Sequence, residues 1–117
     1  MIAQLRAMLV KELSTLEWPV HQYKPDDINE VPCFVVDRPT VEVDVQLYTV
    51  RCSVIVIGRR INDDDAQAEL DNVTEQAMLA IRGPEINVST VDPIIAMVAE
   101  LTHPAYRIDT SAGFINC

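Results

Sequence analysis

The stretch VEVDVQLYTVRCSVIVIG, residues 41–58, decides the fold class of this chain. Apolar side chains occupy the odd positions from Val41 to Leu47, and then the even positions from Tyr48 to Val56. Alternation with a period of two in a valine-rich stretch predicts β structure. Because the alternation changes phase near Leu47–Tyr48, we expect two strand segments joined by a bulge or a bend.

The length of this stretch suggests a contact between subunits. A straight strand over residues 41–57 would extend about 55 Å at ~3.3 Å per residue, whereas a compact chain of this size has a radius of gyration near 13 Å. The strand therefore either bends or forms an arm that reaches a neighbouring subunit. Exposed valines on such an arm would form an apolar contact with another subunit. The two arginines that follow the strand could contact acidic residues of that subunit. The interface candidates are Val41, Val43, Val45, Leu47, Tyr48, Arg59 and Arg60.

The residues before this stretch predict a helix and a second strand. Leucines recur at spacings of three and four, which predicts an amphipathic helix over residues 2–17. Pro19 prevents its continuation, and turn-forming residues predict a loop over 20–30. Residues 31–37, VPCFVVD, form a short apolar run that is typical of a buried strand.

The residues after it predict a second helix over 63–81, which Gly83 and Pro84 end. Residues 86–91 favour a strand. Residues 94–101 fit either a short helix begun by Asp92-Pro93 or a strand, and a last hairpin is expected around 109–113. Together these elements predict one α+β domain over 1–117, with a mainly antiparallel sheet and two amphipathic helices.

Charge and cysteine content restrict the class of protein. The net charge of −9, from 18 acidic and 9 basic residues, argues against binding of a nucleic-acid backbone. No apolar run approaches the ~20 residues of a membrane-spanning helix, and residues 1–18 lack the basic and apolar blocks of a signal peptide. The three cysteines include no CxxC pair, which favours reduced thiols in an intracellular protein.

Sequence motifs for catalysis or metal binding are lacking. Two isolated histidines and three dispersed glycines supply neither a metal-ligand pattern nor a phosphate-binding loop. Residues 63–65, three aspartates, could attract a divalent cation, but a charged helix N-terminus explains them more simply. Glu42 and Asp44 have no partner base. We therefore expect no enzyme activity, no catalytic residue, no cofactor and no bound metal.

Several segments resemble the tail terminator proteins of long-tailed phages, including the lambda-like family. The order is AQLRAMLVKEL, then VPCFVV, LYTVRCSVIVIG, DDAQAELDNVTEQAMLAI and finally PIIAMVAELTHPAYRIDTSAGF. The resemblance covers most of the chain and lies in pattern and loose motifs. It implies a strand for residues 94–101.

The resemblance also implies a function in the virion. It implies a ring, usually a hexamer, at the head-proximal end of the tail, assembled in the host cytoplasm. The ring would stop polymerisation of the tail tube protein and offer a surface to the head–tail connector proteins. DNA would pass through its lumen without specific binding, because acidic walls repel phosphates. The candidates for lumen-facing acids are Asp26, Asp27, Asp63, Asp64 and Asp65.

Three alternative functions are compatible with the same residues. A head–tail connector, neck or other minor tail protein would share the fold, because fold does not fix function. A small non-viral adaptor could bind one protein partner through its sheet edge. A metal-dependent hydrolase that uses acidic residues is the third, and it would require tight binding of a divalent cation.

Overall fold

The computed structural model describes residues 2–22, 31–60, 64–98 and 100–115, and it confirms the α+β fold with a mainly antiparallel sheet. Two helices and six strands are present in these ranges. In chain order they are α1 (Ile2–Leu13), β1 (Val20–His21), β2 (Cys33–Val36), β3 (Thr40–Val43), β4 (Leu47–Ile57), α2 (Asp64–Ile81), β5 (Asn87–Val98) and β6 (Leu101–Ile115).

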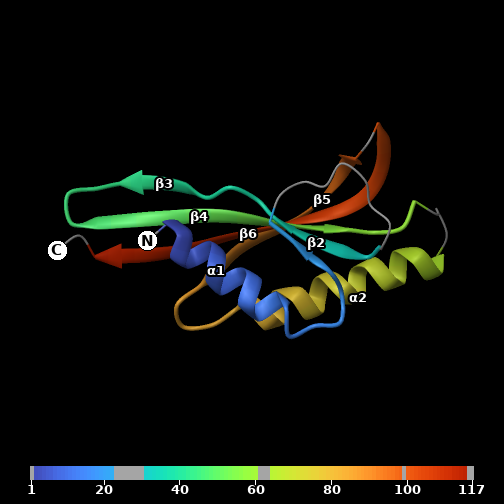
Figure 1. The fold of residues 1–117 in the computed structure, drawn as a ribbon, viewed down its shortest axis with the longest axis horizontal. Helices are drawn as coiled ribbons and strands as arrows, with labels where there is room; N and C mark the ends of the chain where they lie inside the picture. The colour runs from blue at the N-terminus through green and yellow to red at the C-terminus, as the bar shows by residue number, and fades with distance from the viewer. Residues whose placement is uncertain (1, 23–30, 61–63, 99, 116–117) are drawn as a thin grey trace.

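One twisted sheet contains all six described strands (Figure 1). Five of them follow the order β1-β2-β4-β6-β5, and β3 also pairs with β4. β4 and β6 lie at its centre, and β4 pairs with β6 along its whole length, from Leu47 opposite Ile115 to Ile57 opposite Ala105. β2 and β3 share the other edge of β4. β2 pairs with its second half and β3 with its first half. Among the described strands, only the short β1–β2 pair is parallel. Because β1 covers Val20 and His21, the first part of the expected 20–30 loop is a strand, and residues 23–30 lie outside the described residues.

The phase change in residues 41–58 comes from a chain reversal. β3 and β4 form an antiparallel hairpin, in which Val43 lies opposite Tyr48. The Asp44 N–H donates to the Leu47 carbonyl at 3.0 Å and closes the turn. The expected bulge or bend within one continuing strand is therefore wrong. A tight turn also shifts which positions face the core, so the alternation could not distinguish the two cases.

A projecting ribbon nevertheless exists. The molecule measures 50 × 26 × 22 Å along its principal axes. The β3–β4 turn and the end of β6 extend past the start of α1 (Figure 1, left). This three-stranded extension is the shape that an arm would need, although it is made of a hairpin and a third strand.

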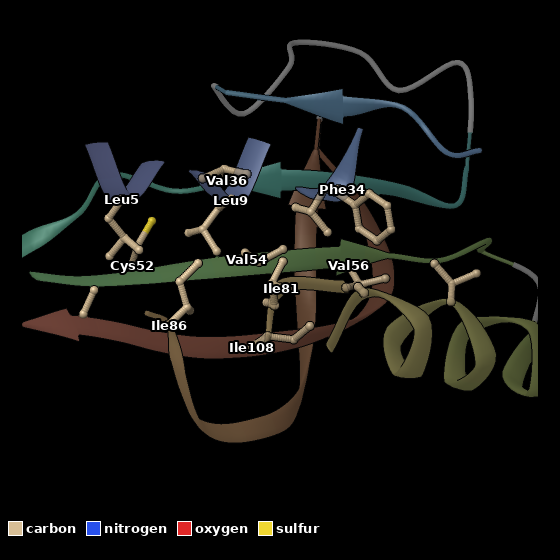
Figure 2. Close-up of a cluster of buried hydrophobic side chains, with 14 of the residues drawn as sticks. Leu5, Leu9, Phe34, Val36, Cys52, Val54, Val56, Ile81, Ile86 and Ile108 are labelled. Atoms are coloured by element: carbon tan, nitrogen blue, oxygen red, sulfur yellow. The ribbon is translucent and has the colours of Figure 1, made fainter. Parts of the chain in front are cut away.

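Both helices cover one face of the sheet. Leu5, Leu9 and Leu13 of α1 are fully buried, as are alternate residues of β4. Figure 2 shows Leu5 and Leu9 directed towards the β4 residues Cys52 and Val54, above Ile81 of α2 and Ile108 of β6. The recurring leucines in the sequence therefore identified the buried face of this helix.

α1 ends at Leu13, four residues before the predicted end. The Ser14 hydroxyl donates to the Val10 carbonyl at 2.6 Å, and the Thr15 hydroxyl to the Glu12 carbonyl at 2.7 Å. The backbone N–H groups of Thr15 and Leu16 bond three residues back instead of four. These bonds tighten the last turn before Pro19, because serine and threonine side chains compete for helical carbonyl groups.

β5 and β6 form one long hairpin at the C-terminal side of the chain. Residues 94–98 belong to β5, so the strand interpretation is confirmed and the short helix is wrong. β6 passes through residues 109–113 without turning, so the expected last hairpin is also wrong. The chain reverses between Val98 and Leu101, which lie opposite each other, and Glu100 between them has a φ of 66°. Pro93 is tolerated because β5 is an edge strand.

A smaller apolar cluster lies on the sheet face opposite the helices. Its buried members are Cys33, Val35, Ile57, Val98 and Ala105, from strands β2, β4, β5 and β6. In Figure 1 the outer part of the β5–β6 hairpin curves away from the rest of the sheet. Within the described ranges, neither helix combines the length and the apolarity that a membrane crossing requires.

Candidate interaction surfaces

The end of the projecting ribbon exposes three large apolar side chains. Val43 is 72% exposed, Val45 85% and Leu47 44%. Val43 ends β3, Val45 lies in the turn and Leu47 begins β4. We call this group, together with Tyr48 and Phe114, the ribbon tip. Exposed apolar side chains grouped on one projection are typical of a contact with another protein.

Val43, Tyr48 and Phe114 of the ribbon tip continue the helix-covered face of the sheet, whereas Leu47 lies on its other face. Val41 pairs with Val50, and the pair packs into the main core. One step further out, Tyr48 lies opposite both Val43 and Phe114. The predicted contact residue Val41 is therefore half-buried core rather than free surface. Phe114 was missed, because its segment was expected to form a hairpin.

The acidic residues of the hairpin have local partners. Arg51 and Glu42 form an exposed ion pair, with Nε and Oε1 at 2.9 Å. The Val45 N–H donates to Asp44 Oδ1 at 2.7 Å and supports the turn. Glu42 and Asp44 therefore do not act as a pair of carboxylates, and Asp44 brings a negative charge to the ribbon tip.

Arg59 and Arg60 follow the opposite end of β4 from the ribbon tip. Ten residue steps separate Leu47 from Ile57, which is about 33 Å of extended chain. Arg59 pairs with Glu69 of α2 at 2.9 Å, and the Arg60 Nε donates to the Thr102 carbonyl at 3.1 Å. The structure therefore does not unite the two parts of the predicted interface.

A groove lies on the sheet face opposite the helices, near the end of the molecule that is far from the ribbon tip. Its volume is about 330 Å³. Ile55 and Ile57 of β4 form part of its lining, between residues 35–38 on the β2 side and residues 94–97 of β5. Ile94 and Ala96 of β5 pack against the apolar cluster on this face, whereas Ile95, 75% exposed, and Met97, 55% exposed, alternate with them. The sequence pattern did not predict this groove, because it joins residues of β2 and β5 that are far apart in the chain.

Basic side chains lie around the groove. Arg6 of α1 donates to the carbonyl groups of Gln22 and Val36. Arg38 is exposed, and its backbone N–H donates to the Asp37 carboxylate at 2.8 Å. A second hollow, lined by Arg6, Lys11 and others, shares Arg6 and Gln22 with the groove. The groove is thus apolar inside and mainly basic at its border.

The predicted lumen acids are only partly placed. Asp64 and Asp65 are exposed in the first turn of α2, where they complement the helix dipole. Asp26, Asp27 and Asp63 lie outside the described residues.

A polar network occupies the sheet face opposite the helices. Asp109 accepts hydrogen bonds from Ser53 at 2.7 Å and from Thr90 at 3.0 Å. Arg107 lies 3.4 Å from the same carboxylate and 3.9 Å from that of Asp92. These contacts link β4, β5 and β6, and they satisfy each carboxylate with neighbours in the sheet.

The two described cysteines are buried and free. Burial raises the pKa of the Cys33 thiol to about 11, and it has the same effect on Cys52. In the part of the chain that the structure describes, no three histidine, cysteine or acidic residues cluster as metal ligands.

Comparison with models of known protein families and with curated proteins yields no match for this chain.

Proposed function

We propose that this protein is a structural, ring-forming subunit of the phage tail-terminator type. The observation that carries the proposal is the presence of two separate apolar surfaces, the ribbon tip and the groove, towards opposite ends of one small domain. A cyclic ring needs two different complementary patches on each subunit. The distribution of exposed apolar residues meets that requirement.

The terminator role rests on the sequence resemblance and on charge. A ring of such subunits carries a large negative charge, because each chain contributes −9. Acidic inner walls would let DNA slide through without being trapped. Recognition of the tail tube and of the connector proteins then requires only burial of complementary surface, with no covalent chemistry.

The first test measures the mass of the purified chain in solution. A hexamer of 13.1 kDa chains has a mass of about 79 kDa. We expect a closed ring near this mass by light scattering, and a ring image by electron microscopy. A chain that remains monomeric at every accessible concentration contradicts the proposal.

The second test concerns the tail itself. Deletion of the gene from its phage should give tails of excess, uncontrolled length that do not join heads. Tails of normal length contradict the terminator role. If those normal tails also fail to join heads, the related head–tail connector role is favoured.

Substitution at the ribbon tip tests whether it is an assembly surface. Val43→Asp with Val45→Asp should weaken ring formation at least ~100-fold, because a contact that buries two valines would then have to bury two charges. The fold should remain, since both side chains are exposed. The control is Leu79→Asp on α2, which is also exposed, at 58%, and should leave the ring intact. Ring formation at normal strength in the double variant excludes the ribbon tip.

The unpaired outer edge of β5 favours one second candidate, a small adaptor that binds a partner strand. Among the described strands, β5 pairs only with β6. An exposed edge can accept an extended segment of another protein. An adaptor would be monomeric without its partner, so the same mass measurement separates the two functions.

A further inference from the structure

We propose that the groove binds the ribbon tip of a second copy of this chain, with Val45 inside the groove and Asp44 facing Arg38. This inference rests on the proposed ring function and assigns its contact surfaces. It makes the interface heterologous, since each subunit offers its tip to one neighbour and its groove to the other.

The two surfaces match in their apolar character. The tip presents Val43, Val45 and Leu47, and the groove presents Ile55 and Ile57 of β4 with Ile94 and Ala96 of β5. The groove volume of about 330 Å³ lies at the lower end of the range for sites that enclose a small ligand. A hairpin turn with one central valine is an occupant of comparable size.

Their charges are complementary. Residues 41–50 contain two acidic and no basic residues, and one of the acids, Glu42, already pairs with Arg51. Asp44 therefore supplies the net negative charge of the turn. Arg6, Lys11 and Arg38 lie around the groove or its adjoining hollow, and Asp37 is the one acid among the described residues that line them. In a chain of net charge −9, such a basic border selects an acidic partner such as this turn.

The occupant must come from another molecule. The tip and the groove lie towards opposite ends of β4, whose extended length of about 33 Å keeps them apart. β4 is fixed along this whole length by pairing with β6. A tip therefore cannot fold back into its own groove, and every filled groove joins two copies.

The outer edge of β5 can contribute backbone hydrogen bonds to the same contact. Residues 94–97 line the groove, and β5 has no partner on that side among the described strands. An incoming β3–β4 turn could align with this edge.

A mixing experiment tests the inference. One variant carries Val45→Asp in the tip, and the other carries Ala96→Asp in the groove. Val45 is exposed and Ala96 is half-buried, so both variants should fold. Each variant alone should be monomeric. Their mixture should form a 1:1 dimer, because one intact tip and one intact groove remain.

The outcomes are distinct when mass is measured by light scattering and folding by circular dichroism. A monomeric mixture overturns the inference, as does a full ring from either variant alone. A ring that forms through another interface leaves the proposed function standing and removes only this inference. A ring joined tip to groove that fails to stop tube growth removes the terminator role and retains this inference.

Charge exchange is an independent test. Arg38→Asp and Asp44→Arg should each weaken self-association about 10-fold, and the double variant should recover most of it. The control is Arg82→Asp, an exposed arginine just after α2 that belongs to neither surface. Additive loss in the double variant contradicts the pairing of Asp44 with Arg38.

Discussion

Cys33 and Cys52 illustrate how a single side chain acts in this fold. Both occupy strand positions on opposite faces of the sheet, and each is almost fully buried. The Cys52 thiol donates to the Asp37 carbonyl at 3.2 Å. They behave as small apolar residues, because burial raises the thiol pKa to about 11 and disfavours the reactive thiolate.

The raised thiol pKa predicts a loss of stability in alkali. The ordinary thiol pKa of 9.0 applies to the unfolded chain, and about 11 to the folded one. Between pH 9 and 11 the unfolded chain therefore holds fewer protons, so the free energy of unfolding should fall as pH rises. The free energy of unfolding, measured by urea denaturation at each pH, should fall less steeply with pH in the Cys33→Ala, Cys52→Ala variant than in the unsubstituted protein. An equal slope in the variant contradicts the prediction.

At the scale of elements, α1 is held in place mainly by the leucines on its buried face. Leu5, Leu9 and Leu13 are fully buried, and the helix contacts α2, β2 and β4. A helix of 12 residues is marginal by itself in water. Its stability must therefore come from packing on the sheet.

Leu9→Ala should destabilise the protein by about 2–5 kcal/mol, the cost of lost apolar burial and of the cavity left behind. The measurement is the free energy of unfolding in urea. Leu79→Ala on α2 is the control; because Leu79 is exposed, its loss should cost under about 0.5 kcal/mol. A Leu9→Ala cost below about 1 kcal/mol would show that α1 is not a docked element.

At the scale of the whole molecule, the net charge sets the electrostatic interaction with polyanions such as DNA. With a net charge of −9, and with Arg51, Arg59 and Arg107 paired to acids, the chain presents little basic surface. The basic border of the groove is small and local. This balance suits a protein that lies beside DNA without binding it.

Duplex DNA should therefore not bind the protein at about 0.15 M salt, where screening still leaves repulsion between the surfaces. Fluorescence polarisation of a labelled duplex should stay flat up to high micromolar protein concentration. Salt-dependent binding in the micromolar range would contradict this prediction, and Arg38→Asp would then show whether the groove border is responsible.

The sequence by itself determined the fold class, the two helices and most of the strands. Local periodicity carries that information, as the leucines of α1 and the alternation in β4 demonstrate. The length of the alternating stretch also allowed a projecting arm with exposed valines, and Val43, Val45 and Leu47 are exposed in the structure. These features depend only on neighbours within a few residues.

Only the tertiary structure decided where the chain reverses and which distant residues meet. A turn at residues 44–46 and a bulge produce the same phase change in sequence, and the antiparallel β3–β4 pairing with the Asp44–Leu47 bond distinguishes them. Likewise β6 continues through 109–113 because β4 pairs with it residue by residue. The groove between residues 35–38 and β5 unites segments almost sixty residues apart, which no local pattern can specify. Long-range pairing and the curvature of the sheet set these features.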